Sequence, residues 1–294
     1  MFRNVLIGID GTPHGRDAIA LARRIAAPGA ELTLVHVHAG EHNRLHAIRR
    51  ERLEQEQRDS EALLEDERRA AGVGAEIRAY VAESPGAGLH RLAEELGADL
   101  IVVGSTSHGA VGRVALGDDA RAALNGSPCA VAIAARGYEG HAEPIAGVGV
   151  GYNDSAEAQA ALQAAHDIAA PTAAAVRLLE VISIPSYSYS GMMAPVGEGI
   201  ELMLSEAQQR IDELPGVTGT AVFGLAGEEL AAFGEDVDIL VVGSRSYGPL
   251  RRLVLGSTSE YLERKARCSL LVLPRSAAHP GGEPDTAAAD PAAA

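Results

Sequence analysis

"VDILVVGSRSYGPLRRLVLGSTS" spans residues 237–259, and a closely similar stretch, "ADLIVVGSTSHGAVGRVALGDDA", spans residues 98–120. Both open with a hydrophobic run that does not alternate with polar residues, which is typical of a parallel β-strand covered on both faces. A segment rich in glycine and serine follows each run and leads into an expected helix. The sequence therefore predicts a strand-loop-helix unit that occurs twice.

The duplication extends along nearly the whole chain of 294 residues. The matching segments are 4–26 with 147–169, 32–37 with 176–181, 98–109 with 237–248, and 129–136 with 268–275. We interpret the pattern as a tandem repeat with a first domain at 1–137 and a second at 145–275. Residues 276–294 are rich in Ala, Pro, Gly and Asp and are predicted to be disordered.

Short β-rich segments alternate with longer helical segments in each half. In the first half, strands are expected near 4–9, 32–38, 75–82, 99–104 and 129–135, and helices near 14–27, 44–71, 86–96 and 117–126. This alternation predicts an α/β fold in which each half forms a doubly wound parallel sheet with right-handed crossovers. Ligands of such sheets bind at the carboxyl ends of the strands, where strand order reverses. The prediction places Asp10, at the end of the first strand, near the loop after the fourth.

The composition excludes several classes of function. A net charge of −15 argues against nucleic acids and anionic membranes as partners, because both require a basic surface. No stretch reaches the roughly 18 apolar residues of a membrane span, and the amino terminus does not resemble a signal peptide. We therefore expect a cytoplasmic protein in which Cys129 and Cys268 are reduced, buried thiols.

Glycines and hydroxyl residues follow a fixed spacing in the second half. Gly243 is followed by two residues, Ser246, nine residues, and then Gly256 and Ser257. Glycine allows backbone N–H groups to approach a polyphosphate closely, and the helix expected to begin at Gly256 directs its positive end at the same anion. Ser257 and Thr258 add hydroxyl donors. The alternative is that Ser257 only caps the helix.

This spacing resembles the nucleotide-binding motif of the universal stress protein family, in which a glycine, two residues, a second glycine and nine residues precede Gly-Ser or Gly-Thr. The resemblance includes the turn after the first strand, the "DLIVVGS" strand and the "LGS" helix start. It covers nearly the whole chain as two consecutive domains, as in tandem actinobacterial members. It implies two five-stranded parallel sheets of order 3-2-1-4-5, similar to the Rossmann-like adenine-nucleotide alpha hydrolase fold.

The resemblance also implies a function and an assembly. Members of this kind bind an adenine nucleotide such as ATP, with or without Mg²⁺, and act as regulatory proteins rather than enzymes. The last strand of each half would form an open sheet edge, which soluble proteins avoid, and family domains pair through it. We expect an intramolecular pseudo-dimer, and the sequence leaves further homodimerisation open.

The residues expected to bind the nucleotide in the second half are Asn153, Val181, Gly243, Ser246, Gly248, Gly256, Ser257 and Thr258. Two of them depart from the family pattern. Ser246 replaces the second glycine, and Asn153 replaces the aspartate that lies against the adenosine end of the ligand in nucleotide-binding relatives. Asn153 keeps a side-chain acceptor but loses the charge.

The corresponding residues in the first half are Asp10, Val37, Gly104, Ser107, Gly109, Gly117 and Asp118. Asp118 stands where the second half has a hydroxyl. A carboxylate about 5 Å from a phosphate charge opposes binding by about 3 kcal/mol at an effective dielectric constant near 20. We predict that this site is degenerate or selects a less anionic ligand, unless a divalent cation bridges carboxylate and phosphate.

Two further features have more than one interpretation. His36 and His38 share one face of a strand and are followed by His42 and His46 at helical spacing, which permits a metal site, although solvated or packed histidines are the favoured interpretation. The segment 184–199 follows the second strand of the second half. It is interpreted as a plain connection, with a lid over a ligand as the alternative.

Three functions remain compatible with the sequence. The first is a stress-response or regulatory protein that binds an adenine nucleotide in the second half. The second is a scaffold that binds no nucleotide and acts through protein–protein contacts. The third is a slow ATP hydrolase, which we rank last because no general base is evident. Gly256 and Ser257 favour the first function, whereas Asp118 and Asn153 favour the second.

Overall fold

A computed structural model describes residues 1–39, 46–105, 111–114, 118–141, 143–183, 196–244, 253 and 256–274. In the first half, the elements are β1 Phe2–Gly8, α1 Pro13–Ile25, β2 Ala26–Ala39, α2 His46–Ala71, β3 Glu76–Ala82, α3 Pro85–Leu96, β4 Leu100–Gly104, α4 Asp118–Leu124 and β5 Ala130–Ala134. In the second half, they are β6 Gly147–Tyr152, α5 Ala156–Ala169, β7 Ala175–Ile182, α6 Val196–Asp212, β8 Thr218–Phe223, α7 Ala226–Phe233, β9 Ile239–Gly243, α8 Ser257–Lys265 and β10 Ser269–Leu273. Short 3-10 turns lie at η1 Tyr138–Gly140, η2 Ala170–Thr172 and η4 Gly234–Asp236.

The predicted alternation of strands and helices is confirmed, and most bounds agree within a few residues. The end of the first helix differs, because α1 stops at Ile25 rather than at residue 27. Pro28 explains this end, since the residue before a proline is pushed out of the helical region. The chain turns at once into β2, and Ala26 pairs with Phe2 of β1.

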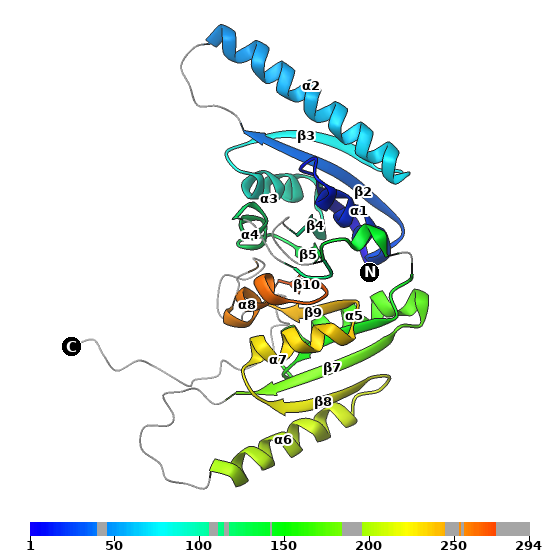
Figure 1. The fold of residues 1–294 in the computed structure, drawn as a ribbon, viewed down its shortest axis with the longest axis vertical. Coiled ribbons are helices and arrows are strands. Elements are labelled where there is room, and N and C mark those ends of the chain that lie inside the picture. Colours follow the sequence, from blue (N-terminus) through cyan, green and yellow to red (C-terminus); the bar gives the residue numbers. More distant parts are fainter. Residues whose placement is uncertain are drawn as a thin grey trace, which may run out of the picture.

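The strands form one continuous sheet of order β3-β2-β1-β4-β5-β10-β9-β6-β7-β8 (Figure 1). Within each half the strands are parallel, and the order within each half is the expected 3-2-1-4-5. β5 and β10 pair antiparallel, with Leu271 opposite Ala132. The sequence predicted two five-stranded sheets, and the structure joins them into a single sheet of ten strands.

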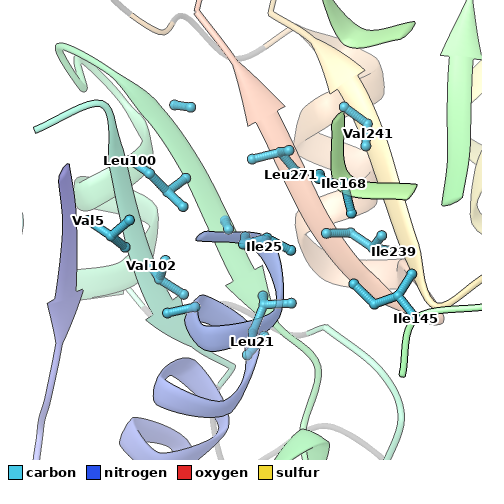
Figure 2. Packing of buried hydrophobic residues seen from close by; sticks show 14 of the residues in the cluster. Val5, Leu21, Ile25, Leu100, Val102, Ile145, Ile168, Ile239, Val241 and Leu271 are labelled. Atoms are coloured by element: carbon cyan, nitrogen blue, oxygen red, sulfur yellow. The ribbon is translucent and has the colours of Figure 1, made fainter. Parts of the chain in front are cut away.

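The hydrophobic core lies on both faces of this sheet and runs through both halves. On one face, Val5 and Val102 of the first half belong to the same buried cluster as Ile239 and Leu271 of the second half (Figure 2). On the other face, Ile101 and other residues of the first half cluster with Leu240 and others of the second. Because neither core ends at the boundary, the two halves pack as one body.

The segments that follow β4 and β9 cross from one half to the other. Val114 N–H donates to the carbonyl of Ala266 at 2.9 Å, and Leu253 N–H donates to the carbonyl of Ser127 at 2.9 Å. Gly126 N–H in turn donates a hydrogen bond to the carbonyl of Leu253 at 2.9 Å. Each glycine-bearing segment is therefore anchored on the chain just after the last helix of the opposite half.

The connection between the halves is docked on α1. Asp17, which is 3% exposed, accepts hydrogen bonds from Gly137 N–H at 2.9 Å and from Glu139 N–H at 2.8 Å. The ring of Tyr138 is buried and lies under the guanidinium of Arg24, whose Cζ is 4.9 Å from the ring centroid. The segment between the two predicted domains is thus fixed at its start by side chains of the first half.

Two further expectations concern cysteines and membranes. Cys129 and Cys268 are free and buried, as expected. Burial raises the pKa of each thiol to about 12. Among the described helices, none is both long and apolar enough to cross a membrane.

Candidate functional site

A cavity of about 450 Å³ lies at the carboxyl ends of β6, β7 and β9 in the second half. Six residues of the predicted second-half site line it, namely Asn153, Val181, Gly243, Gly256, Ser257 and Thr258. The other two, Ser246 and Gly248, lie outside the described residues. The structure therefore brings together residues from three strand ends and one helix start.

One wall of the cavity is apolar. Leu179 and Val181 come from β7, Leu230 from α7 and Val242 from β9. Gly151 of β6 leaves room for this wall, because a Cβ there would lie 3.1 Å from Val242 Cγ1. Packing of this kind suits the face of a flat, apolar ring.

The amino terminus of α8 forms another part of the cavity lining. Gly256 is the residue before the first helical turn, and no side-chain hydrogen bond caps the helix among the described residues. Ser257, Thr258 and Ser259 supply hydroxyl groups from this turn to the cavity lining. Ser257 is the first helical residue, so the alternative in which it merely caps α8 is not what the structure shows. The N–H groups of an uncapped first turn, with the positive end of the helix dipole, favour an anion.

Asn153 forms a tight turn between β6 and α5. Its Oδ1 accepts hydrogen bonds from Ser155 Oγ at 2.7 Å and from Ser155 N–H at 3.4 Å. Ser155 in turn caps α5 by accepting from Ala158 N–H at 3.2 Å. Asp154 between them has φ of 57°, where the first half has Gly11 with φ of 77°. Asp154 also accepts a bond from Tyr152 Oη, and burial together with this bond raises the pKa of Tyr152.

Gly243 has a packing reason that does not depend on a ligand. A Cβ at this position would lie 2.6 Å from Glu157 Cβ in the first turn of α5. Gly104 stands in the same relation to His14 of α1, whose backbone carbonyl carbon would lie 2.6 Å from an added Cβ. The first glycine of each motif is thus required where the strand end passes over a helix.

Among the lining residues that the predicted set omits are two polar residues beside Gly243. Glu157 lines it with a carboxylate from the first turn of α5. Ser244 also lines it, is 6% exposed, and has a buried Oγ without a hydrogen-bond partner among the described residues. A glutamate carries little signal by itself, and the packing of α5 against β9 places Glu157 beside the motif. Ser244 follows Gly243 directly in the sequence and was not included in the predicted set.

The first half has a smaller cavity at the equivalent place. It measures about 140 Å³ and is lined by the predicted residues Asp10, Val37 and Gly104. Asp118 is the first residue of α4, and its side chain lies outside the description. The predicted residues Ser107, Gly109 and Gly117 also lie outside the described residues.

Comparison with known proteins gives the family. The model of the universal stress protein family matches residues 1–135 and 147–274. The chain belongs to the universal stress protein family.

Individual relatives agree with this assignment. A universal stress protein of Thermus aquaticus is 32% identical over 140 residues, covering 45% of this chain and 97% of the relative. The solved structure of a universal stress protein from Archaeoglobus fulgidus has a TM-score of 0.65 at 18% identity and covers 93% of this chain and 98% of its own. A protein of Pseudomonas aeruginosa has a TM-score of 0.60 at 18% identity and covers 93% of both chains. At this identity, the two structures show the shared fold alone.

The histidines of this universal stress protein are held by neighbours. His36 Nδ1 lies 2.7 Å from the carbonyl of Ile9, and His38 Nε2 lies 3.3 Å from Gln57 Oε1. Within the described ranges, no group of three or more His, Cys, Asp or Glu side chains is arranged to hold a metal ion. His42 and the side chain of His46 lie outside the description, as do residues 184–195 of the expected connection.

Proposed function

We propose that the second half of this universal stress protein binds an adenine nucleotide such as ATP and that binding serves regulation rather than turnover. The observation that carries the proposal is the cavity of about 450 Å³, which joins an apolar wall to the uncapped amino terminus of α8. Its volume falls within the range of roughly 300–1,000 Å³ that is usual for ligands of this size. The first-half cavity of about 140 Å³ falls below that range.

The two sides of the cavity suit the two ends of a nucleotide. Leu179, Val181 and Leu230 offer an apolar surface for the base. The first turn of α8 offers N–H groups and the hydroxyls of Ser257 and Thr258 for the phosphates. Glu157 opposes an anion, and a divalent cation such as Mg²⁺ shared with the phosphates would offset that repulsion.

The response to binding is expected to pass between the halves. The segment after β9 leads into α8, and Leu253 in that segment is bonded to Ser127 of the first half. We treat the two halves as an intramolecular pseudo-dimer joined through β5 and β10. A nucleotide bound at α8 would therefore affect a segment that is also hydrogen-bonded to the first half.

The test begins with the small molecule carried by the purified protein. Mass spectrometry after denaturation is expected to release close to one adenine nucleotide per chain, and calorimetry of the emptied protein is expected to show one site for ATP with Mg²⁺. Ser257→Asp is expected to weaken ATP binding about tenfold or more, because a carboxylate near a phosphate costs about 3 kcal/mol at 5 Å and an effective dielectric constant of 20. Two nucleotides per chain would contradict the assignment to the second half alone.

Ser84→Asp is the matched control. Ser84 caps α3 in the first half by accepting from Ala87 N–H at 3.3 Å, and aspartate caps a helix equally well. The control adds the same charge away from the second-half cavity, so ATP affinity should not change. Equal affinity of the wild type and Ser257→Asp would contradict the proposed site.

The alternative is a scaffold that acts through protein contacts. Exposed apolar side chains favour it, because Phe223 at the end of β8 is 46% exposed and Leu225 just after it is 65% exposed. A protein that carries no nucleotide and binds no added ATP with Mg²⁺ would support this alternative over the nucleotide site.

A further inference from the structure

Asp10 and Asn153 stand at equivalent positions and use the same side-chain atom to hold the same turn. Asp10 Oδ1 accepts from Thr12 Oγ1 at 2.7 Å and from Thr12 N–H at 3.0 Å. Asn153 Oδ1 accepts from Ser155 Oγ at 2.7 Å and from Ser155 N–H at 3.4 Å. In each half the residue closes the turn between the first strand and the first helix, and each also lines its cavity.

These bonds fix which way the Asn153 amide faces. A backbone N–H can only donate, so the atom that meets Ser155 N–H must be the amide oxygen. The polar atom that remains is Nδ2, which carries two N–H donors and has no partner among the described residues. In Asp10 the remaining atom is Oδ2, which accepts and carries charge. The same position therefore presents a donor in the second half and an anionic acceptor in the first.

Two polar neighbours of Asn153 use their side chains in other hydrogen bonds. Ser155 Oγ donates to Asn153 and accepts from Ala158 N–H. Tyr152 Oη donates to Asp154 Oδ1 at 3.1 Å. As far as the described residues show, the amide nitrogen of Asn153 thus keeps its donors for a ligand in the cavity.

The topology places the sugar of a nucleotide beside Asn153. β6 lies between β7 and β9 in the sheet, and Asn153 follows the end of β6. The apolar wall of Leu179 and Val181 lies on β7, and the helix that would meet the phosphates follows β9. A base on the first side and phosphates on the second leave the connecting ribose over the end of β6.

We propose that Asn153 determines the specificity of the second-half site by donating to a ribose oxygen, so that this site accepts nucleotides whose sugar hydroxyls are alkylated or phosphorylated. The inference rests on the proposed nucleotide site. A free hydroxyl can accept from Asn153 or donate to a carboxylate, whereas a blocked oxygen can only accept. A carboxylate such as that of Asp10 leaves a blocked oxygen without a donor and repels a phosphorylated one.

The experiment compares ATP with 2′-O-methyl-ATP and 3′-O-methyl-ATP on the wild-type chain and on Asn153→Asp. The quantity of interest is the ratio of the dissociation constant for each methylated nucleotide to that for ATP. Steric effects of the methyl group are the same in both proteins, so a change in the ratio reports the polarity of residue 153. Asn153→Asp should fold, because Asp10 already holds the same turn as an aspartate.

We expect at least one methylated nucleotide to bind the wild type within about threefold of ATP, and its ratio to rise severalfold in Asn153→Asp, because the carboxylate offers the methylated oxygen no donor. Asp10→Asn makes the opposite change in the first half and should leave the ratios unchanged. Unchanged ratios in Asn153→Asp, with ATP still bound in the second half, would overturn this inference alone. A wild type that binds none of the three nucleotides would overturn the proposed function as well.

Discussion

Arg121 of α4 and Glu263 of α8 form an ion pair across the two halves, with Arg121 Nε and Glu263 Oε1 2.7 Å apart. The Glu263 side chain is 1% exposed, whereas Arg121 is 38% exposed. Burial raises the pKa of Glu263, and the nearby Arg121 acts in the opposite direction. In the repeat, Leu124 of the first half corresponds to Glu263, and it is fully buried. The same interface position is thus charged in one half and apolar in the other.

This asymmetry predicts that removing Arg121 alone lowers the free energy of unfolding more than replacing both Arg121 and Glu263 with apolar residues. Arg121→Ala leaves a buried carboxylate with Arg264 Nε 3.6 Å away as its remaining cation, and we expect a loss of about 1–3 kcal/mol in the free energy of unfolding. The double variant Arg121→Met with Glu263→Leu copies the apolar side and should stay within about 1 kcal/mol of wild type or exceed it. Urea unfolding at pH 7 measures both. A double variant less stable than Arg121→Ala would contradict the account.

Asp17 is predicted to hold the connection between the halves. Asp17→Ala removes the acceptor for Gly137 N–H and Glu139 N–H, and two bonds to a buried carboxylate are together worth about 2–4 kcal/mol. The variant should lose about that much stability and be cleaved faster by protease between residues 136 and 141. Asp66→Ala is the control, because Asp66 is 75% exposed and its surface pair with Arg69 is worth about 0–1 kcal/mol. Equal protease resistance in the two variants would show that the connection is held by other contacts.

Gly243 is predicted to be required for packing, with or without a ligand. Gly243→Ala places a methyl group 2.6 Å from Glu157 Cβ and should cost about 1–3 kcal/mol through overpacking. Gly199→Ala is the matched substitution in α6, where an added Cβ meets nothing within 4 Å. That control should leave stability unchanged or raise it by up to about 1 kcal/mol. The melting temperatures of the two variants, measured without nucleotide, test this prediction. Equal melting temperatures would refute the packing role of Gly243.

The two thiols are predicted to be unreactive and to weaken the fold at alkaline pH. Burial raises the pKa of Cys129 and Cys268 from 9.0 to about 12, so the folded state keeps their protons after the unfolded state has lost them. The stability that these thiols contribute therefore falls as pH rises from about 9 towards 12. At pH 8, a disulfide reagent should label neither thiol in the native protein and both in guanidinium chloride.

Removing both thiols tests whether they lower the stability of the fold as the pH rises. The double variant Cys129→Ala with Cys268→Ala should lose less stability between pH 8 and pH 10.5 than the wild type, even if it is less stable overall because of the cavities it creates. A steeper loss in the variant would mean that other groups govern the alkaline limb. Rapid labelling of the native wild type would show that the thiols are accessible.

Much of the fold could be predicted because its signals are local and occur twice. Unbroken hydrophobic runs such as Leu100–Gly104 identify strands covered on both faces. Because the same pattern occurs in both halves, each strand assignment is supported twice. The predicted helix 14–27 ran two residues past the observed end of α1 at Ile25, although Pro28 is a local signal for that end. These features depend on neighbours in the sequence, so no tertiary information is needed to find them.

The cavity lining was predicted in part, and the division has a physical cause. Asn153, Gly243 and Ser257 each end a strand or begin a helix, and a parallel sheet gathers such positions at one edge. Glu157 could not be found in this way, because its place in the cavity depends on how closely α5 packs against β9. Ser244 follows the end of β9 and could have been included by the same rule. The role of Gly243 was also interpreted as a phosphate approach before the structure showed its contact with α5.

The sequence by itself determined the duplicated α/β architecture and the strand-loop-helix motif. Hydrophobic periodicity and glycine spacing involve residues that are close together in the sequence, so they can be recognised without the structure. Only the tertiary structure decided that the halves share one ten-stranded sheet and continuous cores. It alone showed that Arg121 meets Glu263 across the boundary between the halves. Such relationships arise between residues far apart in sequence, where side-chain packing and hydrogen-bond partners depend on the whole fold.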